Sequence, residues 1–524
     1  MKFDFDKIID RSNTGCVKWD SPCPVSGGFA AESSPASSVL SGSAAESSPA
    51  SSVLSGFAAE SSPASSVLSG FAAESSPASS VLSGFAAESS PSSLPLGGTG
   101  WGVLPLWVAD MDFAVAPAIQ EAVKRRAQHP IFGYTHVQPD YYDAVISWFH
   151  RRHQWDIQRD WILYTTGVVP AMSVAIKALT MPGERVLILS PDYNCFFSSI
   201  RNNGCEVAES RLLRFSRNND QNSSSMSLCQ SDENAPFPLP SGGLGWGQRR
   251  APFSIDWPSF EAICADEKTT VFLLCNPHNP TGRVWTRDEL HHMADICHRN
   301  HVRIVSDEIH CELIMPGHTF VPMGTVDPEA VILNSPSKSF NIAGLQMANI
   351  ICQDAATRRR LDRAININEV CDVNPFAPEA VKAAYNDSED WLDALNLYLW
   401  DNYRALCDFV AQHLPQWQVM PLEGTYLVWV DVSASLSAAT VPSGFAAGPP
   451  ATIAPSGFAA GPSATVRFDS VETYCSYLLD HAQVWLNPGT MYGPVSGEGY
   501  VRINIACPRA LLMEALQRIS ALSA

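Results

Sequence analysis

The sequence predicts an α/β protein with a largely parallel, doubly wound sheet in a large domain and a smaller α+β domain. Short apolar runs alternate with helical patterns through the middle of the chain, and this alternation is typical of a parallel sheet with helices on both faces. The runs are apolar at successive positions, as expected of strands that are buried on both faces. After Pro375 the pattern changes to long amphipathic helices and further apolar segments, which predict the second domain.

Individual elements can be assigned from these patterns. Strands are predicted at Arg185–Ser190, Thr270–Cys275, Val302–Asp307 and Ala330–Ser335. A helix is predicted over 286–300, because Thr286 stands three residues before Glu289 in the spacing of a capping box. In the C-terminal part, helical periodicity over 388–413 precedes the strand-like segments "TYLVWVDV" and "YVRINIA".

Composition limits the classes of function. The chain has 524 residues, 46% of them hydrophobic and 17% charged, and a net charge of −19, so no nucleic-acid surface is indicated. No apolar run is long enough to cross a membrane, and the start "MKFDFDKIID" lacks the apolar core of a signal peptide. The fourteen cysteines include no C-x-x-C pair, which favours a reducing cytoplasm and predicts no metal site.

Three low-complexity segments interrupt the predicted domains. The phrase "GFAAESSPASSVLS" recurs with variation every 14 residues from Gly28, and the other two segments are rich in Ser, Gly and Pro. Such composition buries too little apolar surface to offset chain entropy, so we interpret the segments as tolerated insertions, with a binding tail or spacer as the alternative. The predicted order is an N-terminal arm at 1–20, an insertion at 21–103, the start of the core at 104–130, a large domain at 131–370 with an insertion at 216–252, and a small domain at 371–524 with an insertion at 433–467.

Chemically distinctive residues follow the predicted strands. Lys338 stands among serines after one strand, Asp307 ends another, and the turn "NPHNPTGR" with Asn279 follows a third. The segment "TTGVVPAMS" places Val168 at the start of a helix, where free backbone N–H groups can bind a phosphate, and Tyr193 follows a further strand. Taken singly, each of these residues could instead have an ordinary structural role, in a loop, at a helix cap or at the rim of the core. Together they predict a planar, phosphorylated, cationic cofactor that forms a Schiff base with the lysine.

The motifs resemble a known family. "NPHNPTG", "SDEIH", "SPSKSFNIAG" and "YVRINIACPR" are similar to the pyridoxal 5'-phosphate (PLP) enzymes of fold type I, in the class I/II aminotransferase superfamily. "DRSNTGCVKWD", "LPLWVADMDF", "FGYT" and "TTGVVPAMS" resemble the cystathionine β-lyase, or C–S lyase, subgroup. The resemblance covers nearly all of the chain outside the three insertions. It implies PLP fold type I, with PLP in the large domain and a small domain from the N- and C-terminal parts.

The resemblance implies roles for the residues that match. Lys338 would form the Schiff base, Asp307 would pair with the pyridine nitrogen, and Asn279 would bind the ring's 3-oxygen. Tyr193 would stack on the ring, and His310 would also lie at the cofactor.

Further residues would bind the phosphate and the substrate. The backbone N–H groups of Val168 and Val169 would bind the phosphate. The remaining implied contacts are Ser335 or Ser337 on the phosphate, Tyr134 on the phosphate of the neighbouring subunit of a homodimer, Arg502 on the substrate α-carboxylate, and Ala109 and Asp110 on the substrate. Arginine suits its role because the guanidinium group binds a carboxylate in a bidentate manner.

Two positions depart from typical aminotransferases. His310 stands where those enzymes usually carry tyrosine, as expected of the C–S lyase subgroup. Gln346 stands where they often carry a phosphate-binding arginine, which puts that one phosphate contact in doubt.

The resemblance implies β-elimination from cysteine S-conjugates, such as L-cystathionine, to a thiol, pyruvate and ammonia. Three alternatives stay open: an aminotransferase on the same fold, a lyase-like regulator that binds a protein partner, and a chain that the insertions prevent from folding. The sequence leaves open whether the reaction serves methionine synthesis or cysteine breakdown.

Overall fold

The computed structural model describes residues 3–21, 102–214, 253–367, 373–437, 439–441 and 464–522. The described residues 3–21 and those from 103 onward belong to one compact unit. Most of the predicted insertions at 21–103, 216–252 and 433–467 lie outside the described residues.

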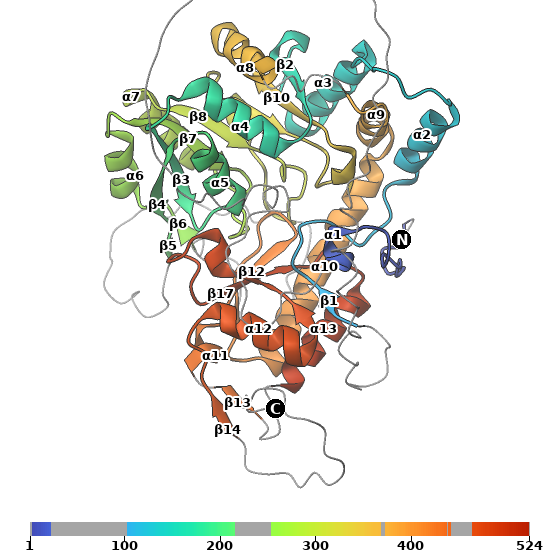
Figure 1. Ribbon diagram of the computed structural model, residues 1–524, viewed down its shortest axis with the longest axis vertical. Helices are drawn as coiled ribbons and strands as arrows, with labels where there is room; N and C mark the ends of the chain where they lie inside the picture. Colours follow the sequence, from blue (N-terminus) through green and yellow to red (C-terminus); the bar gives the residue numbers. More distant parts are fainter. Residues whose placement is uncertain are drawn as a thin grey trace, which may run out of the picture. The chain divides into compact units, whose positions relative to one another are not determined.

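A seven-stranded sheet forms the centre of the larger part of the fold (Figure 1). Its strands, in spatial order, are β2 (Ile162–Thr165), β10 (Ala348–Cys352), β9 (Val331–Asn334), β8 (Arg303–Asp307), β7 (Thr269–Cys275), β3 (Arg185–Ser190) and β4 (Glu206–Arg211). The pairs from β9 to β4 are parallel, and β10 is antiparallel to both of its neighbours. The mainly parallel α/β sheet and its four predicted strands are therefore confirmed.

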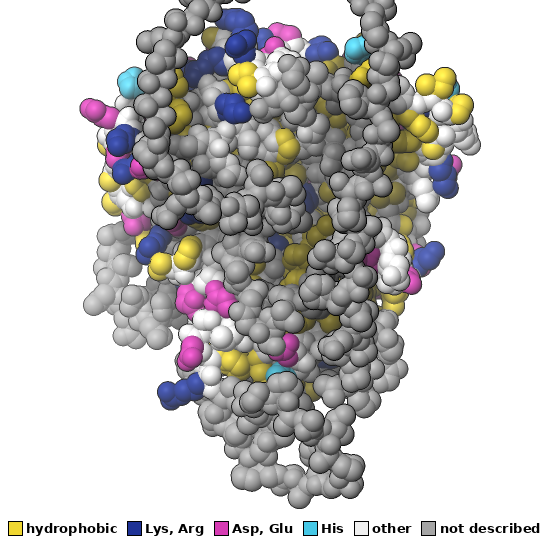
Figure 2. Space-filling model, viewed as in Figure 1, with side chains coloured by type: hydrophobic (Ala, Val, Ile, Leu, Met, Phe, Trp, Pro, Cys, Tyr) yellow, Lys and Arg dark blue, Asp and Glu magenta, His cyan; other side chains and the backbone are white. Residues whose placement is uncertain are grey.

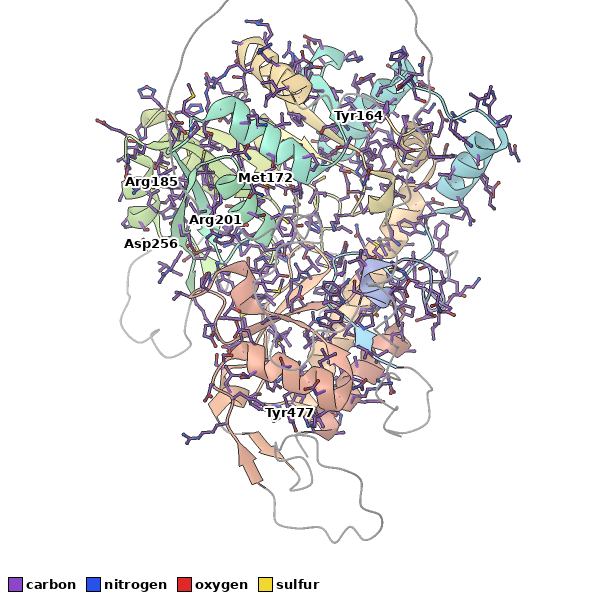
Figure 3. The ribbon with its side chains drawn as sticks, viewed as in Figure 1. Tyr164, Met172, Arg185, Arg201, Asp256 and Tyr477 are labelled. Atoms are coloured by element: carbon purple, nitrogen blue, oxygen red, sulfur yellow. The ribbon has the colours of Figure 1, made fainter. Side chains whose placement is uncertain are left out.

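Helices cover both faces of this sheet. One face packs in an apolar core against α4 (Val168–Leu179), α5 (Asn194–Asn202) and α8 (Ala355–Ile367). Met172 of α4, labelled in Figure 3, belongs to this core and is fully buried. Side chains alternate along a strand, so Phe272 points to the other face, where its ring meets Phe260 of α6 (Trp257–Cys264).

The predicted capping box is present. Helix α7 spans Arg287–Arg299, and the Thr286 hydroxyl accepts from the Glu289 N–H while the Glu289 carboxylate accepts from the Thr286 N–H. This reciprocal pair satisfies two backbone donors at the helix start and fixes where the helix begins.

The C-terminal part forms a second, antiparallel sheet with helices. Its strands, in spatial order, are β11 (Gln418–Val419), β12 (Leu427–Asp431), β17 (Tyr500–Asn504) and β16 (Asn487–Pro488). The helices of this part are α10 (Glu389–His413), α11 (Ser433–Ser437), α12 (Val471–Ala482) and α13 (Arg509–Ala521). The predicted change to α+β structure in this part of the chain is confirmed.

The N-terminal part of the chain joins both parts of the fold. Strand β1 (Leu104–Pro105) pairs in parallel with β15 (Val484–Trp485), so the chain after the first insertion enters beside the small sheet. Helices α2 (Pro117–Gln128) and α3 (Pro139–His153) then pack against α9 (Ala377–Asp387). The short helix α1 (Val17–Asp20) lies next to residues 107–112 through side-chain contacts of Lys18 and Trp19.

Paired strands flank two of the segments that are not described. Strands β5 (Leu213–Arg214) and β6 (Phe253–Ser254) pair across residues 215–252, and β13 (Ala439–Val441) and β14 (Ala464–Val466) pair across 442–463. The chain therefore leaves and re-enters each pair at adjacent positions.

In Figure 2, basic and acidic side chains are interspersed among the coloured residues of the visible face. Within the described ranges, no helix combines the length and the apolar content needed to cross a bilayer.

Candidate active site

The predicted site residues come from the carboxyl ends of neighbouring parallel strands. Asn279 follows β7, Asp307 ends β8, and Lys338 follows β9. Because β7, β8 and β9 are adjacent and parallel, these ends lie along one edge of the sheet. Tyr193 follows β3 in the same way.

Lys338 is partly buried at this edge and faces the segment around residue 109. Its ammonium group donates a hydrogen bond to the Ala109 carbonyl. Burial lowers the pKa of Lys338 to about 8, the charge of Asp110 acts in the opposite direction, and Arg502 adds to the lowering. An amine with this pKa can gain and lose a proton near neutral pH.

Asp307, at the end of β8, and His310, in the turn that follows, are both buried. The Ile309 N–H donates to Asp307 Oδ1 at 3.1 Å, and burial raises the pKa of Asp307 to about 7. Burial also holds the pKa of His310 well below its usual value, so this imidazole is neutral. His310 Nδ1 is buried without a hydrogen-bond partner within the described part of the chain, and the ring packs edge-on against Tyr426.

Arg502 links the small sheet to the turn after β7. One of its terminal nitrogens donates to Asn279 Oδ1 at 3.2 Å and the other to the Trp107 carbonyl at 2.9 Å. The guanidinium carbon lies 4.6 Å from the centre of the Tyr492 ring. Arg502 Nε is buried and has no hydrogen-bond partner among the described residues, so part of the guanidinium group is available to a ligand.

Tyr193 belongs to the same cluster. Burial raises the pKa of its hydroxyl well above the usual value, and the charges of Arg502 and Asp307 also act on it. The Tyr193 ring packs edge-on against Phe196. The structure thus brings together Lys338, Asp307, Tyr193 and Arg502 as the sequence predicts.

At the predicted phosphate-binding end of the site, the start of a helix offers backbone N–H donors, and one of the two serine hydroxyls is already hydrogen-bonded within the chain. Gly167 precedes α4 without a side-chain cap, and Val168 and Val169 occupy the first turn, whose N–H groups have no acceptor within the helix. The Ser335 hydroxyl donates to the Met347 carbonyl at 2.6 Å and accepts from the Ser337 N–H at 3.1 Å. Of the two predicted serines, Ser335 therefore already uses its proton within the chain.

Two predicted positions lie at the surface of this chain. Tyr134, on the loop between α2 and α3, is 94% exposed and is not among the residues gathered at the strand ends. Gln346 is exposed, and its backbone adopts the left-handed conformation, with φ of 55°. The Tyr164 hydroxyl donates to the Gln346 carbonyl at 3.3 Å.

Residues that were not predicted from the sequence hold the segment 108–110 in place. The Tyr426 hydroxyl donates to the Ala109 carbonyl at 2.9 Å, and the Asn504 amide donates to the carbonyls of Val108 and Asp110. Asn504 stands two residues after Arg502 on β17, on the same side of the strand, and this spacing is the signal that could have identified it.

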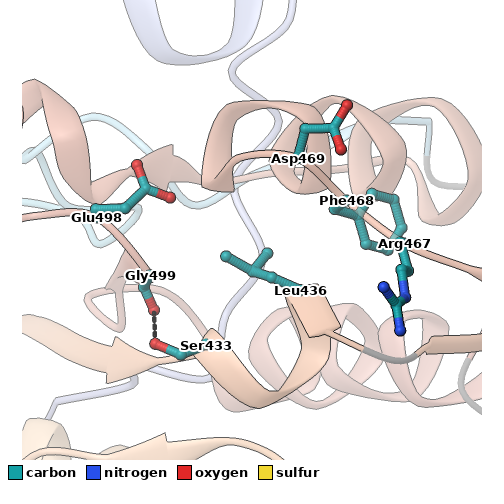
Figure 4. A pocket seen from close by; sticks show the side chains of 7 residues that line it. All are labelled: Ser433, Leu436, Arg467, Phe468, Asp469, Glu498 and Gly499. Carbon is teal, nitrogen blue, oxygen red and sulfur yellow. Dashed lines mark hydrogen bonds between the residues drawn. The ribbon is translucent and has the colours of Figure 1, made fainter.

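Two other features lie apart from these residues. His153, Cys311 and Glu312 could group around a metal ion, but Glu312 Oε1 is already hydrogen-bonded to the Trp148 and His153 side chains, each at 2.6 Å, so the cluster fits a buried hydrogen-bond network. Figure 4 shows a pocket beside α11, where Ser433 donates to the Gly499 carbonyl. This pocket is lined by Ser433, Leu436, Arg467, Phe468, Asp469, Glu498 and Gly499, none of which is a predicted site residue.

Comparison with known proteins places this geometry in a family. Residues 102–519 match the family described as aminotransferase class I and II. The chain belongs to this family. Within the family's range, the protein named cystathionine beta-lyase PatB of Bacillus subtilis (strain 168) is 33% identical over 423 residues, which cover 80% of this chain and 92% of PatB.

Two further relatives share most of the chain. Protein MalY of Escherichia coli (strain K12) is 31% identical over 415 residues, which cover 78% of this chain and 89% of MalY. Cystalysin from Treponema denticola, whose crystal structure contains a pyridoxal 5'-phosphate cofactor, aligns with a TM-score of 0.65 and 30% identity over 80% of this chain and 90% of cystalysin. The predicted aminotransferase class I/II fold is confirmed.

Proposed function

We propose that the protein is a PLP-dependent carbon–sulfur lyase that acts on L-cystathionine. The observation that carries the proposal is the convergence of Lys338, Asp307, Asn279 and Arg502 at one edge of the sheet. The similarity to a protein named cystathionine beta-lyase over 80% of the chain supports the lyase over other members of the family.

The donor set of the site fits PLP. A lysine with a lowered pKa suits covalent attachment to an aldehyde, and a buried carboxyl at Asp307 suits a protonated ring nitrogen. The free N–H groups at the start of α4 suit a phosphate. His310 Nδ1 and Arg502 Nε are buried polar atoms for which the described residues supply no hydrogen-bond partner, so a ligand could bind them.

When bound, PLP supplies an electron-accepting ring that stabilises negative charge at the substrate α-carbon. Asn279 would orient the ring, and Asp307 would keep the ring nitrogen protonated. Arg502 would hold the substrate carboxylate through Nε and a terminal nitrogen. Together these contacts would hold the substrate so that its Cα proton is within reach of Lys338.

Lys338 would act twice. It would hold the cofactor through its side-chain nitrogen, and when that nitrogen is a free, neutral amine it would take the proton from the substrate Cα. The Cβ–S bond would then break, and Lys338 would pass its proton to the sulfur, which leaves as the thiol of homocysteine. The remaining three-carbon unit takes up water and gives pyruvate and ammonia.

The test is an assay of the purified protein with L-cystathionine, with and without an added 2-oxo acid. A lyase releases one pyruvate for each homocysteine without any acceptor. If amino-group transfer to the 2-oxo acid occurs and no thiol appears, the protein is an aminotransferase and the lyase proposal fails.

We also propose a homodimer, in which Tyr134 reaches the cofactor phosphate of the neighbouring subunit. Ile131 is 67% exposed, Phe132 is 56% exposed and Tyr134 is 94% exposed on one loop, and such a cluster is unusual for a surface that stays in water. Sedimentation of the PLP-bound protein tests this proposal: a monomer at micromolar concentration would overturn it.

We place the protein in a reducing compartment, the cytoplasm, because eleven cysteines in the described residues are free. Thiol alkylation during denaturing lysis of cells, without added reductant, tests this: alkylated cysteines support the assignment, and cysteines blocked in disulfides contradict it.

A further inference from the structure

The motif "DRSNTGCVKWD" supplies two cations to a pair of carboxylates that lie far along the chain. Arg11 contacts Asp110 and Asp112, each at 2.7 Å. Lys18 contacts Asp112 at 2.6 Å and approaches Asp110 at 3.7 Å. Each cation therefore faces both carboxylates, and the N-terminal arm is tied to the segment 107–112.

The charges of this cluster are largely buried, so losing one partner would be costly in free energy. The Lys18 side chain is fully buried and that of Asp112 is 4% exposed, so each charge depends on its partner for stabilisation. The Trp19 indole N–H donates to Asp112 Oδ1 at 2.9 Å. In return, the Trp107 indole N–H donates to the Lys18 carbonyl at 3.3 Å. The arm and the segment can therefore shift only together.

The same segment borders the candidate active site. The Ala109 carbonyl accepts from Lys338, and the Trp107 carbonyl accepts from Arg502. Asp110 adds a negative charge that acts on the amine of Lys338. A displacement of residues 107–112 would therefore move the atoms that orient the lysine and the arginine.

The contacts of Arg11 also set how much negative charge faces Lys338. The charges of Asp110, Arg502 and Asp307 act on Lys338. Of these, Asp110 has its charge partly neutralised by Arg11 and Lys18. Loss of Arg11 would leave Asp110 free to move toward the lysine.

We infer that Arg11 and Lys18 are positioning residues, which hold residues 107–112 so that the Ala109 carbonyl and the Asp110 carboxylate keep Lys338 in place. The inference rests on the proposed function, because it gives Lys338 a catalytic role. Neither cation touches the substrate in this account, since both act through the two aspartates.

The experiment compares the PLP-bound full chain with Arg11→Ala, Arg11→Lys and the control Arg358→Ala. Arg358 is a matched control because its side chain is 16% exposed, against 21% for Arg11. It pairs with Asp160 and bonds the Cys352 carbonyl beside the start of β9, at the edge of the sheet opposite Lys338. The readouts are kcat and KM for pyruvate release, and amide hydrogen exchange of residues 107–113 in the chain with and without PLP.

For Arg11→Ala we expect kcat to fall on the order of 10-fold, because Lys338 loses its fixed position. We expect KM to stay within about 2-fold of the parent value, because Arg502 keeps its hydrogen bond to Asn279 outside the displaced segment. Exchange at 107–113 should rise on the order of 10-fold, since one ion pair of the arm is lost. Arg11→Lys should recover part of kcat, because lysine keeps the positive charge but cannot contact Asp110 and Asp112 through two separate nitrogens. Arg358→Ala should leave kcat, KM and exchange at 107–113 unchanged.

The inference is overturned if Arg11→Ala keeps the parent kcat and exchange, or if Arg358→Ala loses as much kcat. It is also overturned if Arg11→Lys recovers nothing. A parent protein that releases no pyruvate would refute the proposed function instead, and faster exchange at 107–113 in Arg11→Ala would then still support the positioning role.

Discussion

Arg502 donates a hydrogen bond to the Asn279 side-chain oxygen at 3.2 Å, although the two residues stand 223 positions apart in the sequence. Arg502 comes from β17 of the small sheet, and Asn279 comes from the turn after β7 of the large sheet. The residue proposed to hold the substrate is thus bonded to the residue proposed to orient the cofactor ring. A substitution of either residue is therefore expected to alter the position of the other.

Arg502→Lys should weaken substrate binding. Lysine keeps the charge but loses the planar pair of donors, so we expect kcat/KM for L-cystathionine to fall about 10- to 100-fold, mainly through a higher KM. Steady-state kinetics measure this loss. Arg358→Lys provides the control and should leave KM unchanged, and an unchanged KM in Arg502→Lys would remove the carboxylate-binding role.

Asp307→Asn should slow the reaction without unfolding the chain. A neutral amide cannot hold a ring nitrogen protonated, so kcat should fall on the order of 100-fold or more. The neighbouring carboxyl of Glu308 is equally buried but bonds to the Ser306 hydroxyl at 2.9 Å and the Met323 N–H at 2.8 Å. Glu308→Gln should therefore lower the melting temperature and largely keep kcat, and equal loss of kcat in both variants would contradict the assignment.

The capture of PLP by the cofactor-free chain should depend on pH through Lys338. Only the neutral amine attacks an aldehyde, and burial lowers the pKa of Lys338 to about 8. The rate should therefore rise about tenfold per pH unit below pH 8 and level off above it. Stopped-flow absorbance measures the profile. A rate that keeps rising beyond pH 10, as for an ordinary lysine, would be inconsistent with the buried site.

Residues 215–252 should be removable, because we propose that they are an insertion. Arg214 pairs directly with Phe253, so an Asn-Gly turn can close the two strands as a hairpin. We expect the shortened chain to bind PLP. Its melting temperature should lie within a few degrees of the parent's, because loop length has only a weak effect on stability. Val441 pairs with Ala464 across 442–463, which offers a second deletion of the same design. Loss of PLP binding in both would show that these segments belong to the fold.

Much of the fold could be predicted because local patterns determined it. Strand β3 has the predicted bounds Arg185–Ser190, since its residues are apolar at successive positions and form no other regular pattern. Lys338, Asp307 and Asn279 could be predicted because the ends of adjacent parallel strands meet at one edge of a sheet.

The contacts around residue 109 could not be predicted in the same way. Arg11 and Asp110 stand 99 positions apart, and Asn504 and Asp110 stand 394 apart, so no local spacing records their contact. The engagement of Ser335 with the Met347 carbonyl also depends on how β9 and β10 pair. Such contacts arise from tertiary packing, which the hydrophobic pattern of single segments does not encode.

The central claim is that Lys338 holds the cofactor. The PLP-bound protein is reduced with borohydride, which makes the attachment permanent, and is then digested and mapped by mass spectrometry. We expect the added cofactor mass on the peptide that contains Lys338, and neither added mass nor pyruvate release in Lys338→Ala. Cofactor mass on another lysine, or pyruvate release by Lys338→Ala at the parent rate, would contradict the central claim.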